Sequence, residues 1–373
     1  MKTRLRVGVI FGGRSGEHEV SLASAASVLK ALDREKYEVV PIGITPEGRW
    51  ISSTEALGKL MERTGAEGDE QFLVPEPNRQ GLIAAEGGDQ HPMPLDVVIP
   101  LVHGTFGEDG TLQGLLELAN IPYVGAGVLG SAVGMDKIVQ KQLFESHGLL
   151  IPAYYHFHSS EWKEAPQKVV ASIEKQLRYP LFAKPANTGS SVGISKAHNR
   201  RELVSAIELA VTYDLKVIVE QGVREVREIE CSVLGNEKPV ASVLGEIIPS
   251  NEFYDYDAKY VDGKSTAIIP ARLPSGVTKT IRRIAVEAYT LLDLTGMARV
   301  DFFVTKKRNR VYLNEVNTIP GFTSISMYPK LWEASGVSYP ELLDRLIALA
   351  IERHHDKSKL NRTFLPPKDW FKV

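Results

Sequence analysis

Two short segments in the last third of the chain alternate polar and apolar side chains, and a polar linker joins them. They cover residues 298–304 and 311–317, and the linker at 306–310 contains only lysine, arginine and asparagine. A period of two is typical of β-strands, and a short polar connection is typical of a hairpin loop. The pattern predicts two adjacent antiparallel strands, and it fixes which side chains share a face.

The shared face of this hairpin is rich in oxygen. Arg299 and Asp301 lie on one face of the first strand, and a register that places Asp301 opposite Glu315 also places Arg299 opposite Asn317. Two carboxylates and an amide oxygen suit magnesium or manganese, with phosphate oxygens completing the shell. A ladder of surface ion pairs is the alternative. The segment 318–326 favours the metal site, because its Pro-Gly turn can present backbone N–H groups beside these ligands.

A segment rich in glycine and serine, residues 184–193, is expected between two strands and begins with Lys184. Such a loop can offer successive N–H groups and hydroxyls to phosphate, although many similar stretches are only flexible turns. It lacks the Gly-Lys-Ser/Thr ending of a Walker A loop. Its place before the acidic hairpin favours phosphate binding. Lys137 at a helix start is a second candidate cation, or else a solvated lysine.

Two glutamates near the end of another expected strand are candidates for holding ribose hydroxyls. Glu220 ends the strand, and Glu228 follows after a short connection. A glutamate in such a position is also commonly just exposed to solvent. The pattern leaves the choice between them open.

The first part of the chain predicts a parallel α/β unit. An apolar strand at 5–11 leads through a glycine turn into a helix at 16–32, with Ser15 as N-cap, and then a strand at 37–44. The second half predicts mixed sheets with helices, an α+β arrangement. Further helices are expected at 54–62, 111–119, 137–147, 165–177, 200–211, 275–294 and 339–353, and further strands at 96–100, 153–157, 181–184, 217–220, 227–235 and 239–248. Residues 75–92 are expected to form an exposed insertion.

Composition limits the class of protein. The 373 residues are 43% apolar and 24% charged, which is ordinary for a globular protein of several layers, and a net charge of −2 argues against a broad nucleic-acid surface. No apolar run is long enough to cross a membrane, and the short one near the N-terminus does not resemble a signal peptide. The single cysteine, Cys231, is expected to be a buried strand residue in a reducing compartment.

Six segments together resemble the D-alanine–D-alanine ligases, which are ATP-grasp enzymes, over nearly the whole chain. The segments are 12–21, 103–110, 184–193, 257–260, 299–301 and 314–321. The resemblance implies an ATP-grasp fold behind an N-terminal Rossmann-like α/β domain. We divide the chain into an N-terminal domain at 1–136, a central subdomain at 137–222 and a C-terminal subdomain at 223–373.

The resemblance also implies an activity: ATP-dependent joining of two D-alanine molecules through a D-alanyl phosphate, for peptidoglycan synthesis and hence cell shape. ATP and two magnesium or manganese ions are expected in each active site, in a cytoplasmic homodimer formed through the N-terminal domain. Residues 186–192 and 250–269 are expected to close as a lid, since an acyl phosphate hydrolyses in water. The long 45–92 segment is an insertion relative to shorter relatives, with no catalytic role expected.

Residue roles follow from matching positions in the family's motifs. The magnesium ligands are expected at Asp301, Glu315 and Asn317, with Glu315 bridging two ions. The ATP site is expected to consist of the phosphate-binding lysines Lys137 and Lys184, the adenine-binding strand Glu220, Gln221, Gly222 and Val223, the ribose-binding Glu228, and Lys259.

The substrate residues are implied in the same way. Glu17 is expected to hold the ammonium group of the first D-alanine, with Ser190 and Tyr260 as its hydrogen-bonding partners and His103 nearby. Ser324 and Ser326 are placed near the carboxylate of the second substrate. Arg299 and the N–H of Gly321 are expected to face the oxyanion of the tetrahedral intermediate.

Three other interpretations fit parts of the sequence. A D-lactate or D-serine ligase of the same fold is disfavoured by Tyr260, because ester-forming relatives tend to carry a different residue there, often histidine. A nucleotide-binding protein without turnover is disfavoured because Arg299, Asp301, Glu315 and Asn317 are all present. A dinucleotide-binding oxidoreductase is disfavoured because the first strand is not followed by Gly-x-Gly-x-x-Gly.

Overall fold

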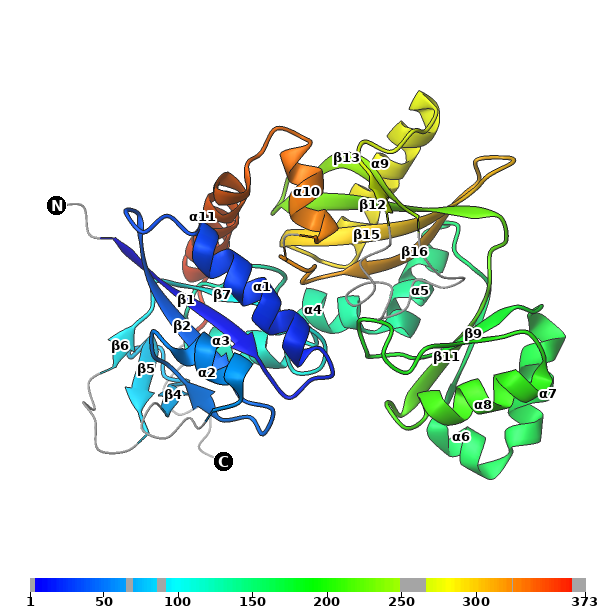
Figure 1. Cartoon of the computed structure of the whole chain (residues 1–373), viewed down its shortest axis with the longest axis horizontal. Coiled ribbons are helices and arrows are strands. Elements are labelled where there is room, and N and C mark those ends of the chain that lie inside the picture. The colour runs from blue at the N-terminus through cyan, green and yellow to red at the C-terminus, as the bar shows by residue number, and fades with distance from the viewer. Residues whose placement is uncertain (1–3, 65–69, 86–91, 249–265, 324, 364–373) are drawn as a thin grey trace, which may run out of the picture.

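The structure is a computed structural model, and it describes residues 4–64, 70–85, 92–248, 266–323 and 325–363 (Figure 1). Three groups of elements surround a central region. Among the described residues, no helix combines the length and the apolar character needed to span a membrane.

The N-terminal unit is a four-stranded sheet ordered β3-β2-β1-β7, in which β1 runs parallel to both β2 and β7. The α/β prediction for this part is confirmed. Its elements are β1 (Leu5–Gly12), α1 (His18–Ala31), β2 (Tyr37–Ile44), β3 (Trp50–Ile51), α2 (Ala56–Glu62), β7 (Val97–Pro100), α3 (Thr111–Leu118) and α4 (Val128–Met135). The expectation that Ser15 caps α1 is wrong. Glu17 occupies the N-cap position, and Ser15 Oγ accepts the Glu17 N–H instead.

The expected insertion at 75–92 is not wholly an exposed loop, because it contains the middle strand of a small antiparallel sheet whose other two strands flank it. The sheet consists of β4 (Gln71–Leu73), β5 (Gly81–Ala84) and β6 (Met93–Pro94). Leu82 on β5 is 1% exposed and packs in one core with Val98 of the main sheet. The turn residues in this region hid strands too short to show a clear period.

The central unit is a four-stranded antiparallel sheet, ordered β10-β9-β11-β8, with its own apolar core. Its elements are β8 (Tyr154–His158), α6 (Ser159–Glu164), α7 (Pro166–Gln176), β9 (Leu181–Pro185), β10 (Ser195–Ala197), α8 (Arg200–Ala210) and β11 (Lys216–Gln221). Helix α5 (Lys137–Ser146) connects this unit to the rest of the chain. Asp136 caps α5 by accepting the N–H groups of Ile138 and Val139.

The C-terminal unit is a five-stranded antiparallel sheet, ordered β14-β13-β12-β15-β16. Its elements are β12 (Val226–Gly235), β13 (Val240–Ile248), β14 (Thr266–Ile268), α9 (Ser275–Leu291), β15 (Gly296–Thr305), β16 (Val311–Asn317), α10 (Met327–Glu333) and α11 (Tyr339–Ser358). The predicted hairpin register is confirmed: Asp301 lies opposite Glu315, and Arg299 lies opposite Asn317. The register of the pairing shifts just after Asp301, which leaves these two residue pairs unaffected.

The last helix returns to the first sheet. Leu342, Leu346 and Ile347 of α11 share one apolar core with Val7 of β1 and Leu22 of α1 (Figure 1). The two ends of the described chain are therefore held together by burial of apolar surface.

Candidate active site

Two adjacent cavities lie where the three units meet. The inner cavity, about 240 Å³, is bounded by the N-terminal unit, the 188–190 turn and the β15–β16 hairpin. The hinge cavity, about 340 Å³, lies between strands β9 and β11 of the central unit and strands β12 and β15. Glu230, Arg299 and Glu315 line both cavities. Groups held in the two cavities would therefore meet at these side chains.

Every predicted site residue that the structure describes lines one of these cavities. Lys259, Tyr260 and Ser324 lie outside the described residues. The inner cavity carries Glu17, His103, Lys137, Ser190, Arg299, Glu315, Asn317, Gly321 and Ser326. The hinge cavity carries Lys184, Glu220, Gln221, Gly222, Val223, Glu228, Arg299, Asp301 and Glu315.

Arg299 and Asp301 form a rigid fork on β15. The guanidinium donates from Nε and Nη2 to the two Asp301 oxygens, at 2.8 and 2.7 Å, and its Nε lies 3.1 Å from Glu230 Oε2. Asn317 donates from Nδ2 to Asp301 Oδ2 at 2.9 Å. The side chains of Arg299, Asp301 and Glu230 are each less than one-fifth exposed. The bidentate contact between Arg299 and Asp301 therefore fixes the guanidinium at the boundary of both cavities.

The donor set of the hairpin fits a hard divalent cation. Among the described residues, no group of three or more His, Cys, Asp and Glu side chains is arranged to hold a metal ion. The predicted set has only two carboxylates, from Asp301 and Glu315, and one amide. Such a set suits magnesium only when phosphate oxygens or water supply the other ligands. The hinge cavity beside it has room for a phosphate-bearing ligand.

A buried cluster of charges joins the central unit to α5. Lys184 Nζ donates to Glu220 Oε2 at 2.8 Å, and Lys141 Nζ lies 3.2 Å from Glu220 Oε1. Burial alone would raise the pKa of Glu220, but the two lysines outweigh it and lower that pKa to about 2. The sequence interpretation missed Lys141. Its spacing of four residues from Lys137, which places both on one face of a helix, was the available signal.

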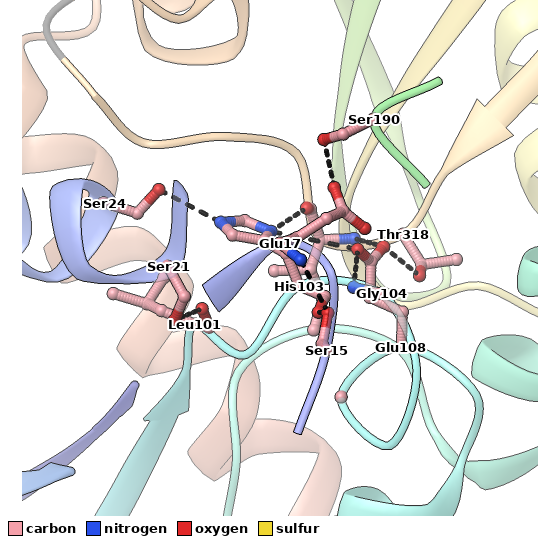
Figure 2. A network of polar contacts seen from close by, with 12 residues as sticks. Ser15, Glu17, Ser21, Ser24, Leu101, His103, Gly104, Glu108, Ser190 and Thr318 are labelled. Atoms are coloured by element: carbon pink, nitrogen blue, oxygen red, sulfur yellow. Dashed lines mark hydrogen bonds and ion pairs between the residues drawn. The ribbon is translucent and has the colours of Figure 1, made fainter. Parts of the chain in front are cut away.

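The Glu17 carboxylate is enclosed near the start of α1 (Figure 2). Ser190 donates its hydroxyl to Glu17 Oε1, while Oε2 is buried and receives no hydrogen bond from the residues described. A Cβ on Gly189 would lie 2.2 Å from Oε2, and one on Gly104 would lie 2.5 Å from it. Only glycine at these two positions leaves room for this carboxylate.

His103 and Glu108 connect the N-terminal unit to the segment after β16 (Figure 2). His103 Nδ1 donates to the Ile319 carbonyl at 3.0 Å, and Glu108 Oε2 accepts the Ile319 N–H at 3.0 Å and the Thr318 hydroxyl. Burial opposes the charged imidazolium, but the Glu108 and Glu17 carboxylates outweigh it and raise the pKa of His103. The sequence interpretation included Glu108 in the 103–110 motif without giving it a role.

The 186–193 turn is tied to both of its neighbours. Asn187 donates from its backbone and its side chain to Asp214 Oδ2, and Lys137 Nζ donates to the Thr188 carbonyl. Together with the Ser190–Glu17 contact, these bonds hold the turn over the inner cavity. On the opposite wall, Ser326 Oγ accepts the Thr323 N–H at 3.0 Å and keeps the turn at Gly321 closed.

The electrostatics of Glu17 predict a gain in stability when its charge is removed. Burial first, and the nearby Glu108 charge second, raise the pKa of Glu17 above 4.5. A carboxyl whose pKa is higher in the folded state destabilises the protein at neutral pH, and this penalty disappears as pH falls through the folded pKa. We expect Glu17→Gln to raise Tm by roughly 2 °C at pH 7.5, with the difference vanishing in acid. Calorimetric melting of both proteins from pH 4.5 to 8 checks this, and parallel profiles would contradict it.

Comparison with known proteins identifies the family. Residues 6–126 match the family model described as the D-ala D-ala ligase N-terminus, and residues 143–348 match the one described as its C-terminus. The chain belongs to the D-alanine–D-alanine ligase family. The observed architecture is accordingly the ATP-grasp fold behind a Rossmann-like α/β domain, as the resemblance implied.

Individual members of the family are similar over nearly their whole length. The D-alanine–D-alanine ligase of Natranaerobius thermophilus is 52% identical over 364 residues, which are 97% of this chain and 99% of that protein. The ligase of Geobacillus kaustophilus is 49% identical, covering 99% and 100%.

Solved structures agree. The D-alanine–D-alanine ligase from Coxiella burnetii gives a TM-score of 0.83 at 39% identity, covering 95% of this chain and 96% of that one. The VanG D-Ala:D-Ser ligase from Enterococcus faecalis gives 0.82 at 38%, covering 93% and 100%. Similarity to these two solved structures therefore does not distinguish D-alanine from D-serine as the second substrate.

Proposed function

We infer that this chain joins two D-alanine molecules into D-alanyl-D-alanine, with conversion of ATP to ADP and phosphate, for the synthesis of peptidoglycan precursors. Membership of the D-alanine–D-alanine ligase family supports the reaction. The observation that carries it is the shared wall of the two cavities. A triphosphate in the hinge cavity and a carboxylate in the inner cavity would meet beside Arg299 and Glu315.

ATP occupies the hinge cavity in this proposal. The backbone of Glu220, Gln221, Gly222 and Val223 binds adenine, and Lys184 reaches the phosphates. The Glu220 carboxylate is already held by two lysines. This supports Glu228, rather than Glu220, as the partner of the ribose hydroxyls.

In this proposal Asp301, Glu315 and Asn317 would hold magnesium or manganese, with two ions in each active site. When bound, the metal supplies positive charge beside the transferring phosphate. The oxygen-rich donor set, with only two carboxylates of its own, supports a cation that binds together with ATP. Lys137 and Lys184 add fixed positive charge on either side.

The first D-alanine binds in the inner cavity, where Glu17 Oε2 accepts its ammonium group. Its carboxylate attacks the γ-phosphorus of ATP, the bond to the ADP oxygen breaks, and D-alanyl phosphate forms. The lid at 186–192, held to Glu17 through Ser190, excludes water from this mixed anhydride. Residues 250–265 of the second expected lid segment, with Tyr260 and Lys259, lie outside the described residues.

The second D-alanine then attacks the acyl carbon with its amine. The tetrahedral oxyanion faces Arg299 and the Gly321 N–H, the carbon–oxygen bond to phosphate breaks, and the proton of the attacking amine passes to the departing phosphate. Ser326, on the same wall of the inner cavity, binds the carboxylate of this second substrate.

We also propose, from the family alone, a homodimer formed through the N-terminal domain and a cytoplasmic location. Analytical ultracentrifugation of the purified chain tests the dimer.

A phosphate-release assay tests the reaction. With ATP and magnesium, D-alanine should release phosphate and yield D-alanyl-D-alanine, whereas L-alanine alone should release none. Arms with added D-serine or D-lactate, read out by mass spectrometry of the products, determine the second substrate. Release with L-alanine alone would refute the assignment, and a mixed dipeptide as the main product would assign the chain to the D-serine ligases.

Gly189 offers a test of the Glu17 pocket. Gly189→Ala places a methyl group in the space of Glu17 Oε2 and should raise the KM for the first D-alanine about tenfold or more. Gly58→Ala is a matched control, because a Cβ at this position on α2 meets nothing within 4 Å. Steady-state kinetics at saturating ATP measure the effect. Equal KM values for the two variants would contradict the proposed role of Glu17.

A further inference from the structure

Lys141 is a deeply buried charge that the proposed mechanism does not use. Its side chain lies on α5 and is 2% exposed, yet Lys141 is not among the described residues that line either cavity. Its ammonium group lies 3.2 Å from Glu220 Oε1. Burying a lysine this completely is strongly unfavourable without a compensating partner, so its position calls for a reason.

Lys141 changes the net charge of the cluster that it forms with Glu220 and Lys184. Glu220 binds Lys184 through one oxygen and Lys141 through the other. A carboxylate that belonged to Lys184 alone would cancel its charge and leave little attraction for a phosphate. Because Lys141 shares the carboxylate, the three groups together carry one net positive charge, and only Lys184 and Glu220 of the three reach the hinge cavity.

Lys141 also fixes the strand that carries Glu315. Its Nζ donates to the Asn314 carbonyl at 3.2 Å, and the neighbouring Gln140 exchanges hydrogen bonds with both the N–H and the carbonyl of Val316. Helix α5 therefore holds β16 on each side of Glu315. One lysine connects the strand bearing the proposed metal ligand to the lysine that faces the phosphates.

We propose that Lys141 is a positioning residue for nucleotide binding, because it keeps the Lys141–Glu220–Lys184 cluster net cationic toward the phosphates. The proposal rests on the assignment of ATP to the hinge cavity. It differs from a purely structural role, because the charge of residue 141 matters more than its packing. The charge of a second partner, Glu220, can therefore be used to test it.

The test measures binding of ADP with magnesium to the full chain by titration calorimetry, and steady-state kinetics for ATP and D-alanine. Lys141→Met keeps most of the length of the side chain and removes its charge. We expect ADP affinity and kcat/KM for ATP to fall about 10- to 100-fold, because the cluster that faces the phosphates would lose its one net positive charge. The KM for D-alanine should stay within about twofold. Lys141→Arg should restore most of the ADP affinity.

The double variant Lys141→Met/Glu220→Gln separates charge from packing. It returns the cluster to one net positive charge, so its ADP affinity should exceed that of Lys141→Met by about tenfold. Additive loss in the double variant, or wild-type ADP affinity in Lys141→Met, would overturn the proposal. If Lys141→Met fails to fold, Lys141→Arg and the double variant are compared instead. Both clusters carry one net positive charge, so the two variants should bind ADP alike, and much weaker binding by the double variant would overturn the proposal. Failure of the wild-type chain to bind ADP would instead refute the assignment of ATP to this cavity.

Discussion

Replacing Arg299 with methionine is expected to lower kcat by about 10²- to 10³-fold, the usual loss when one oxyanion donor is removed. Arg299 lines both cavities and is held in place by Asp301 and Glu230. Its guanidinium is therefore preorganised where the phosphate and the acyl carbon would meet. Phosphate release at saturating ATP and D-alanine measures the effect.

Arg299→Lys is the control for charge. It keeps the positive charge but loses the planar fork that binds both oxygens of Asp301, so an intermediate kcat is expected. Thermal melting must accompany the kinetics, because methionine leaves Glu230, which is buried, and Asp301, which is 14% exposed, without this partner. A methionine variant that melts normally and keeps kcat within about threefold of wild type would remove Arg299 from the mechanism.

Glu315→Gln is expected to lower turnover by about a thousandfold or more while leaving the fold intact. The change preserves shape and removes one negative charge from the proposed metal set, where charge stabilisation in the transition state amounts to several kcal/mol. Glu315 lies opposite Asp301 in the hairpin. Because glutamine preserves the shape of the side chain, the effect of the substitution on packing should be small. Phosphate release across a range of magnesium and manganese concentrations measures it.

Glu287→Gln is a matched control for this substitution. Glu287 lies on α9, and its ion pair with Arg283 is largely exposed at 39% and 67%, so activity should match the wild type. Retention of more than about a tenth of wild-type activity in Glu315→Gln at every metal concentration would exclude Glu315 from the metal set.

Local patterns in the sequence determined a large part of this fold. The shared faces of the hairpin followed from a period of two, and the structure has the register considered with them, which pairs Asp301 with Glu315. The first strand, glycine turn and helix were equally legible, since their signals lie within a few neighbouring residues. Shorter elements such as α10 and β14 were missed, because seven or three residues contain too little of any period to be recognised.

The composition of the site depended on contacts that no local pattern records. Ser190 meets Glu17 across 173 positions of the chain, and Glu108 binds Ile319 across 211. The family's motifs predicted many of these residues as site residues, but only tertiary packing placed them around two cavities with a common wall. Lys141 shows the limit most clearly, because a lone lysine in a helix looks like a solvated one until its carboxylate partner is brought beside it. The sequence by itself determined strands and faces, whereas the folded chain decided which charges are buried together, because burial depends on surfaces distant in sequence.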